Sequence, residues 1–225
     1  MTTDELAAEY CLEATWFVDS DDRGVVEFTE QVVDEAGADT DRERSVALFV
    51  AVRDGWRYDP YASTSEPEAL RASSVLTSSA NWCVPKSVLL TASARAAGIP
   101  ARLGFADVRN HLQSEKLRAK MGTDLFVFHG YSELWIEGRW RKASSAFNRE
   151  LCERFGTKVL DFNGVDDALM HPFDKSGNRH MEYVRQRGSF VDLPLEEMLA
   201  AFAEVYGEGG VLGDSSEGDE FFDAR

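Results

Sequence analysis

The sequence predicts an α+β domain, in which a group of helices is followed by an antiparallel sheet. Apolar side chains recur at helical spacing in some segments, and they alternate or run continuously in others, which is typical of strands. With 225 residues, 44% of them hydrophobic, the chain has the size and composition of one globular domain. The helices are expected over residues 4–18, 25–36, 40–53, 83–97 and 194–206, and the strands over residues 101–108, 125–136 and 139–143.

Three acidic N-terminal helices are predicted. Residues 4–18, 25–36 and 40–53 each carry an apolar stripe at helical spacing. An aspartate-rich break at residues 19–24 separates the first two. Residues 1–44 hold 14 acidic and three basic side chains, so this region is expected to form a solvated acidic surface.

The clearest helix pattern covers residues 83–97. Pro85 stands near its start, where the missing backbone N–H breaks no helical hydrogen bond. Gly98, followed closely by Pro100, ends the helix. Residues 73–80 are small and polar, and they are expected to form a loop that leads into it.

A predicted sheet follows this helix. Residues 101–108 form its first strand, and residues 125–136 are apolar on both faces at first, as in a central strand. Glu137-Gly138 is typical of a tight hairpin turn, after which residues 139–143 return as the partner strand. The charged segment 112–120 is expected to be an exposed helix or loop.

The last third of the chain is less regular until the amphipathic helix at residues 194–206. Residues 207–225 contain five glycines and six acidic side chains, which predicts a disordered, flexible acidic tail. A single domain over residues 1–206 is therefore expected. Its parts are the acidic N-terminal helices (1–44), the core motifs (45–150) and a C-terminal extension (151–206), followed by the tail.

The charge distribution disfavours two classes of partner. The 40 acidic and 24 basic side chains give a net charge of −16, and the excess lies at the two ends of the chain. Binding to nucleic acid or to an anionic membrane surface needs clustered lysine and arginine, so neither is expected. No apolar run approaches the roughly 20 residues of a membrane span.

Cysteine and histidine usage predicts a reducing compartment and no metal. Three cysteines in a chain of this length do not form a disulfide framework, and no secretory signal pattern is visible, so a cytoplasmic location is expected. The three cysteines and four histidines lack the close spacing of a metal site.

Cys83 is the first candidate functional residue. A thiol is a weak nucleophile until it ionises, and the unpaired N–H groups at a helix start favour the thiolate. Lys86, one turn further on, is expected either to favour the thiolate by its charge or to be solvated. The alternative for Cys83 is a buried thiol that packs as a small hydrophobic group. Cys11 and Cys152 lack the helix-start position and are expected to be inert.

His129 is the second candidate. It lies within the apolar strand predicted over residues 125–136. A histidine there either has its hydrogen bonds satisfied in the core or lies at a functional site. A cysteine at a helix start and a histidine on a later strand are what a thiol–imidazole pair needs, because residues distant in sequence can meet in the fold.

Two stretches of the chain together resemble a known family, the transglutaminase-like superfamily. The first is Asn81-Trp82-Cys83-x-x-Lys86, a helix, and Ala97-Gly98-Ile99-Pro100-Ala101-Arg102; the second contains His129, Glu133, Gly138 and Trp140. The likeness covers about residues 45–150. It implies a papain-like core, in which the helix that bears Cys83 packs on an antiparallel sheet that bears His129. It also implies a Cys-His-Asp triad for acyl transfer.

The third position of this triad departs from the family pattern. The family's aspartate follows four residues after the hairpin tryptophan, and counting from Trp140 reaches Ser144. A serine hydroxyl can orient an imidazole but cannot stabilise an imidazolium as a carboxylate does. Several possibilities stay open: Ser144 orients His129, or Asn148 or Asp161 takes the place of the aspartate, or activity is low or lost, or the Ser144 segment is simply a turn.

The residues beside Cys83 suggest a substrate cleft. Asn81, Trp82 and Tyr131 are its candidate lining residues, although aromatic core packing is the alternative for the latter two. The Cys83 backbone N–H and the side chain of Asn81 or Trp82 are candidate donors to an oxyanion.

The predicted function is acyl transfer or hydrolysis at an amide, through a thioester on Cys83 with His129 as the proton acceptor. The chemistry requires no cofactor. The expected partner is a peptide, a protein or a small amide substrate. The alternative function is a catalytically inactive transglutaminase-like module that binds a peptide or protein partner in the same cleft.

Overall fold

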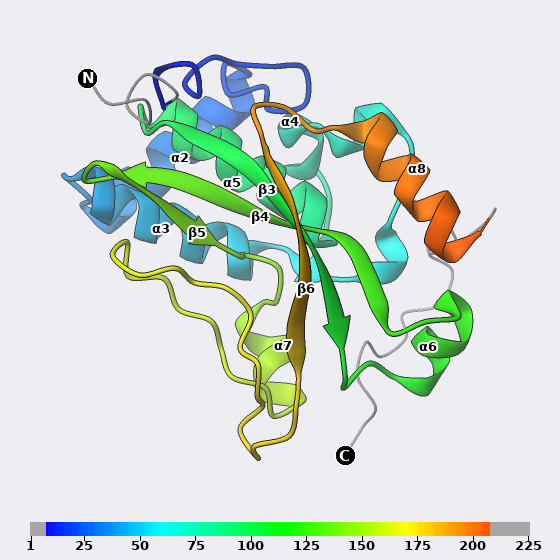
Figure 1. Ribbon diagram of the computed structural model, residues 1–225. Coiled ribbons are helices and arrows are strands. Elements are labelled where there is room, and N and C mark those ends of the chain that lie inside the picture. The colour runs from blue at the N-terminus through cyan, green and yellow to red at the C-terminus, as the bar shows by residue number, and fades with distance from the viewer. Residues whose placement is uncertain (1–7, 208–225) are drawn as a thin grey trace.

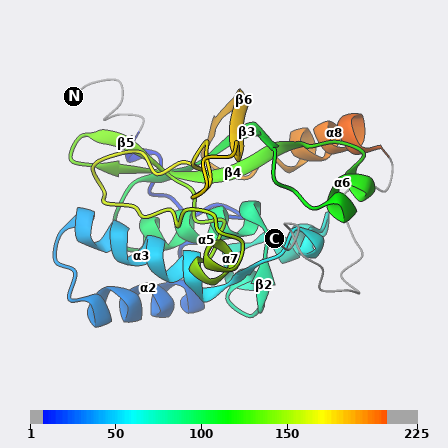
Figure 2. The same ribbon diagram turned by 90° about the horizontal axis from the view of Figure 1, so that it is seen from below.

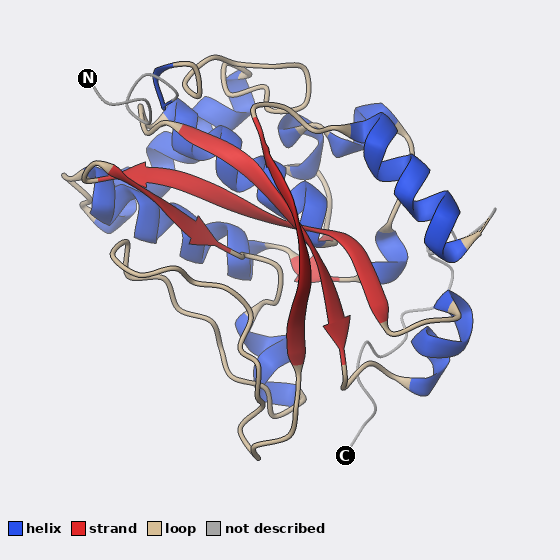
Figure 3. Ribbon diagram, viewed as in Figure 1, coloured by secondary structure: helices blue, strands red, loops and turns tan. Residues whose placement is uncertain are grey.

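A four-stranded antiparallel sheet forms one layer of the fold and helices form the other (Figure 1; strands red and helices blue in Figure 3). The computed structural model describes residues 8–207. The strand order is β5-β4-β3-β6. The strands are β3 (Ala101–Asn110), β4 (Leu125–Ile136), β5 (Arg139–Ala143) and β6 (Met181–Phe190). A separate parallel pair is formed by β1 (Arg57–Tyr58) and β2 (Ala80–Asn81).

The helices gather mostly on one side of this sheet, as Figure 2 shows for α2, α3 and α5. The α-helices are α2 (Arg23–Ala36), α3 (Asp41–Gly55), α4 (Ala72–Val75), α5 (Cys83–Ala96), α6 (Glu115–Met121), α7 (Arg149–Arg154) and α8 (Leu195–Tyr206). Two 3-10 turns are η1 (Pro60–Ala62) and η2 (Pro67–Leu70). The predicted α+β class is confirmed, with the cysteine-bearing helix packed on the antiparallel sheet. Among residues 8–207, no helix combines the length and the apolar run that crossing a bilayer needs.

The central helix α5 is buried from Cys83 to Arg95. It lies between β4 on one side and α2 and α3 on the other. A helix that is enclosed all round needs small or apolar side chains on every face, which explains why its sequence is rich in alanine, valine, leucine and serine.

Local sequence signals fix several element ends. Thr40 and Glu43 form a reciprocal capping box at the start of α3. Glu137 and Gly138 both have positive φ angles, 50° and 76°, as the two central residues of a type I′ hairpin turn require. The predicted hairpin between β4 and β5 is therefore confirmed, including the turn position.

The predicted helix over residues 4–18 is wrong in the part that the structure describes. Only residues 8–9 are helical there, and residues 10–22 are turns and bends. The backbone of this segment bonds to other elements instead: the Cys11 carbonyl accepts from Ala101 N–H, and the Phe17 carbonyl accepts from Ala72 N–H. Tertiary hydrogen bonds have replaced the helical ones. Residues 1–7 lie outside the described part.

Besides the short pair β1 and β2, three further elements were absent from the sequence prediction. The helical turn α4 lies where a loop was expected, α7 follows β5, and β6 pairs with β3. β6 is an edge strand with mostly polar side chains and two register shifts against β3, so no alternating pattern marks it. The helix predicted over residues 194–206 is confirmed as α8. The predicted tail lies outside the described residues from residue 208 onwards.

Candidate active site

Cys83 is the first residue of α5, directly after Trp82 in an extended conformation. Its side chain is buried, with 7% of the residue exposed. The backbone groups of Gly130, Val84 and Cys83 itself act to lower the pKa of the thiol. The thiol lies where the start of α5 meets β4.

Gly130 allows the close contact between β4 and the first turn of α5. A Cβ atom built at Gly130 would lie 2.7 Å from Ser87 Oγ, 3.2 Å from Val84 Cα and 3.4 Å from the Cys83 carbonyl oxygen. Ser87 Oγ is held by a hydrogen bond to the Val84 carbonyl, and the other two atoms belong to the backbone. Only glycine therefore lets the strand approach the helix this closely.

Replacing Gly130 by alanine is expected to lower the free energy of unfolding by about 1–3 kcal/mol, because the added methyl group overpacks a closed contact. Urea unfolding would measure the change. Gly55→Ala is the matched control, since no atom lies within 4 Å of a Cβ built there. If the two variants lose the same stability, close packing at Gly130 is not what positions α5.

His129 lies on β4, and its side chain is buried. Ser144 Oγ is 3.4 Å from His129 Nε2, a long hydrogen bond. The Tyr183 ring stands edge-on to the imidazole at a centroid distance of 6.5 Å. Burial lowers the pKa of His129 to about 4, so the imidazole is neutral at pH 7.

Cys83 and His129 line the same cavity, which has a volume of about 30 Å³. The cavity lies where α5, β4 and α8 meet, and it is otherwise lined mainly by apolar and aromatic groups. The remaining lining residues are Tyr58, Pro60, Ser63, Trp82, Phe126, Val127, Phe202 and Tyr206. A space of this size has room for little more than water.

Burial outweighs the helix start in setting the charge of the thiol. Desolvation raises the pKa of Cys83 to about 11, although the Gly130, Val84 and Cys83 N–H groups act in the opposite direction. The backbone N–H groups therefore act in the expected direction, but burial has the larger effect, as the alternative of a buried thiol implied. At pH 7 both Cys83 and His129 are neutral.

The three candidates for the third position lie in different surroundings. Ser144 is buried and is the one that contacts the imidazole of His129. Asn148 accepts a hydrogen bond from the Tyr58 N–H through its side-chain oxygen, at 3.0 Å. Asp161 is largely exposed and forms ion pairs with Arg53 and Arg149. Its carboxylate is thus committed to two guanidinium groups.

The three candidate cleft residues also lie in different surroundings. Trp82 lines the cavity with Cys83. Asn81 donates from its side-chain amide to Ser78 Oγ. Tyr131 packs over Gly104, where an added Cβ would lie 2.2 Å from its ring, and its hydroxyl donates to Gln186. Of the three, Trp82 is the one that the structure places beside the thiol.

Lys86 is neither a charge beside Cys83 nor a solvated side chain. It is fully buried, and its Nζ donates to the carbonyl oxygens of Arg53 and Trp56, at 2.8 and 2.7 Å. These carbonyls lie at the end of α3, where helical acceptors lack partners. Burial lowers the pKa of Lys86 to about 7. Both expectations for Lys86 are therefore wrong, because the lysine joins α5 to α3.

Seven of the ten lining residues were not among the candidates from the sequence, and two of the seven come from a distant helix. Phe202 and Tyr206 lie on α8, far along the chain from Cys83, and both line its cavity. The apolar stripe of α8 predicted that one face of the helix would be buried, but it did not identify the residues on which that face packs. No group of three or more potential metal ligands gathers among the described side chains.

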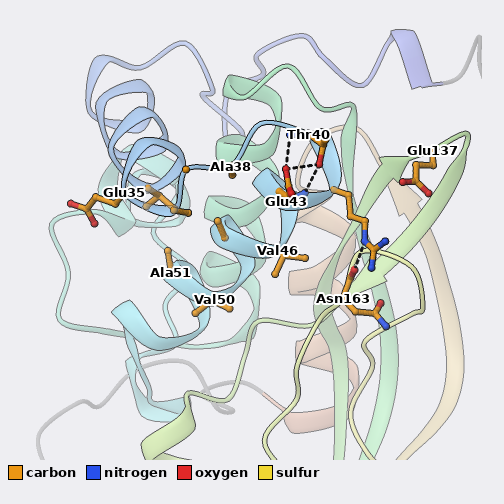
Figure 4. A pocket seen from close by; sticks show the side chains of 14 residues that line it. Glu35, Ala38, Thr40, Glu43, Val46, Val50, Ala51, Glu137 and Asn163 are labelled. Carbon is orange, nitrogen blue, oxygen red and sulfur yellow. Dashed lines mark hydrogen bonds between the residues drawn. The ribbon is translucent and has the colours of Figure 1, made fainter.

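A larger hollow lies elsewhere on the surface, between α2 and α3 (Figure 4). Its volume is about 1050 Å³, and its walls are mainly the valine and alanine side chains of the two helices. Glu43 on its rim is hydrogen-bonded to Thr40 in the capping box, and Arg42 donates a hydrogen bond to the Asn163 carbonyl. These polar groups are occupied in holding the fold together.

A cysteine at the start of a helix, packed on a strand that bears a histidine in an antiparallel sheet, is the arrangement of papain-like thiol proteins. The profile of the Transglutaminase-like superfamily matches residues 27–144, which are 118 of the 225 residues. The chain therefore belongs to the transglutaminase-like superfamily, a family of thiol enzymes.

Two solved structures are also similar to the chain. One is a candidate cysteine protease from Cytophaga hutchinsonii, with 20% identity over 64% of this chain and 43% of that chain, and a TM-score of 0.44. The other is a candidate protease from Parabacteroides distasonis ATCC 8503, with 13% identity over 62% of this chain and 25% of that chain, and a TM-score of 0.38. The chain thus spans less than half the length of either structure. No curated protein sequence matches it.

Proposed function

We propose that the protein transfers or hydrolyses acyl groups through Cys83 and His129. The observation that carries this proposal is that the two side chains line one cavity although they are 46 positions apart in the sequence. The family supports a thiol enzyme, and the geometry supports these two residues as its reacting pair.

In the proposed reaction, the Cys83 thiol passes its proton to the His129 imidazole as the sulfur attacks. The sulfur attacks the carbonyl carbon of an amide, a C–S bond forms, and the C–N bond breaks as His129 returns the proton to the leaving amine. Water or a second amine then attacks the thioester, and the C–S bond breaks as the thiol is restored. Because both groups are neutral at rest, the proton transfer has to accompany the attack.

Neighbouring groups have assisting roles in this proposal. Ser144 is a positioning residue: its hydroxyl accepts a hydrogen bond from His129 Nε2 or donates one to it, and so holds the orientation of the ring. Trp82 is a candidate donor to the carbonyl oxygen, since its indole N–H is buried and has no hydrogen-bond partner among the described residues. The serine leaves the imidazolium less stabilised than an aspartate would, so a modest rate is expected.

With p-nitrophenyl acetate at neutral pH, we expect a burst of one p-nitrophenolate per chain, followed by slower turnover, because acylation of a thiol precedes hydrolysis of the thioester. Stopped-flow absorbance would measure the burst. Added methylamine should raise the second rate if the enzyme transfers acyl groups, and leave it unchanged if it only hydrolyses them. A reaction without a burst, at a rate equal to that of heat-denatured protein, would count against the proposal.

The second candidate function is an inactive binding module. Ser144 at the third position, together with a thiol and an imidazole that are both neutral, favours it. In that case acylation would be absent, while a peptide or protein partner would bind equally well to the wild-type chain and to the Cys83→Ser variant.

A further inference from the structure

We propose that α8 is a displaceable cover that occupies the acyl-binding groove of the site, and that the groove beneath it takes acyl donors with an apolar or aromatic side chain. This inference rests on the proposed function, because it describes how a substrate reaches Cys83. Figure 1 shows α8 beside the sheet, away from the layer formed by α2 and α3.

Two side chains from α8 close the cavity. Phe202 and Tyr206 line it together with Cys83 and His129. The Phe202 ring contacts the Trp82 ring at a centroid distance of 6.0 Å and the Tyr206 ring at 5.6 Å. An acyl group large enough to react at Cys83 does not fit in the remaining space of about 30 Å³. Substrate entry therefore requires these two rings to move.

α8 packs on the core through Met198, Ala201 and Phe202, and two hydrogen bonds fix its C-terminal end. The Tyr206 hydroxyl accepts a hydrogen bond from the Val127 N–H at 2.7 Å and donates one to the Leu125 carbonyl at 3.1 Å. The opposite face of the helix is solvated, with Glu196 and Glu197 exposed. One hydroxyl group thus joins the end of the helix to β4, two residues before His129.

One hydrogen-bond donor beneath α8 has no acceptor in the part of the chain that the structure describes. The Trp82 indole N–H is buried and lacks an acceptor among the described residues, which is unfavourable for a polar group. Its ring packs against Phe202. Displacing Phe202 would make room beside Trp82 for a carbonyl group, whose oxygen can accept this hydrogen bond.

The chemistry of the groove follows from its walls. The ten lining residues include no aspartate, glutamate, lysine or arginine, and Pro60, Trp82, Phe126 and Val127 remain as walls when α8 leaves. The space that the Phe202 and Tyr206 rings leave has the size of bulky aromatic groups. An apolar or aromatic acyl side chain gains from burial there, whereas a carboxylate would be desolvated without a partner.

The test is the rate at which alkylating reagents modify Cys83, followed by mass spectrometry of its peptide. The sulfur displaces the halide, so a C–S bond forms, the carbon–halogen bond breaks, and the thiol proton goes to the buffer. Tyr206→Phe removes both hydrogen bonds of the hydroxyl but keeps the ring, and Phe202→Ala removes the other covering ring. Glu197→Gln on the exposed face of α8 is the control.

With iodoacetamide, Tyr206→Phe and Phe202→Ala are expected to react about tenfold faster at Cys83 than the wild-type chain, because the closed state has lost stabilising contacts. The Glu197→Gln variant should react as the wild type does. The rate ratio should be the same at about pH 7 and pH 9, since access changes and ionisation does not. Equal rates in all four proteins would overturn the idea of a cover.

The second part of the test compares two alkylating reagents. N-benzyl-2-chloroacetamide carries an aromatic ring, and N-chloroacetylglycine carries a carboxylate. We expect the benzyl reagent to modify Cys83 of Tyr206→Phe at least about tenfold faster, corrected for the rates of both reagents with free cysteine. No preference would overturn the apolar groove.

The outcomes separate this inference from the proposed function. Faster alkylation in the α8 variants, without any acylation of Cys83 by p-nitrophenyl acetate, would support the cover and refute the acyl-transfer chemistry. Acylation of Cys83 at the same rate in the wild type and in all variants would support the acyl-transfer chemistry and refute the cover.

Discussion

Replacing Cys83 by alanine is expected to reduce the hydrolysis of p-nitrophenyl acetate by about a thousandfold or more, because no other group at the site can form the thioester. The melting temperature should change little, since alanine is a small apolar residue that fits a buried position. Stopped-flow absorbance and thermal unfolding, measured on the same samples, would show both results.

The other two cysteines provide matched controls for this substitution. Neither Cys11 nor Cys152 forms a disulfide, and each is 2% exposed, less than Cys83. Burial also raises the pKa of each, and neither lines the cavity. Cys11→Ala and Cys152→Ala should therefore retain the wild-type rate. A similar loss in either control, or full activity in Cys83→Ala, would contradict the assignment of Cys83.

Replacing Lys86 by methionine is expected to lower the free energy of unfolding by about 2–4 kcal/mol at about pH 9.5. The substitution leaves the carbonyls of Arg53 and Trp56 buried without their donor, and methionine fills most of the space. Urea unfolding of the two proteins would measure the difference. Lys158→Met, at an exposed position after α7, is the surface comparison, and its effect should stay within about 0.5 kcal/mol.

The effect of Lys86 should also depend on pH. Its pKa is about 7 in the folded chain, well below the ordinary lysine value of 10.5. Between these two values the unfolded chain holds the proton and the folded chain does not, so raising the pH favours the folded state. The stability difference between wild type and Lys86→Met should therefore grow from pH 7 towards pH 10.5. A difference that is constant over this range would show that Lys86 stays charged when buried.

Elements with strong local signals could be predicted from the sequence. The hairpin turn at Glu137-Gly138 requires two positive φ angles, and β4 and α5 begin where the patterns placed them. Elements that depend on distant partners could not be predicted. β6 is a polar strand that forms through its pairing with β3, and residues 10–22 bond to β3 and α4 instead of forming a helix.

Part of the candidate site could also be predicted from the sequence, and part could not. Cys83, His129 and Ser144 were identified by motif spacing and family resemblance, and the structure places Ser144 beside His129 and gives Cys83 and His129 a common cavity. Their catalytic roles stay predictions. The neutral state of the pair could not be predicted, because burial decides it. Nor could the covering of the cavity by α8, since an apolar stripe does not reveal which other face it packs against.

The most direct measurement is to locate the acetyl group after brief incubation with p-nitrophenyl acetate, by peptide mass spectrometry of the wild-type, His129→Ala and Tyr206→Phe proteins. A Cys83–His129 acyl-transfer pair predicts one acetyl group on Cys83 in the wild type, accumulation at least about a hundredfold slower in His129→Ala, and faster accumulation in Tyr206→Phe. Cys83 free of acetyl in both wild type and Tyr206→Phe, or acetylated equally fast without His129, would contradict it.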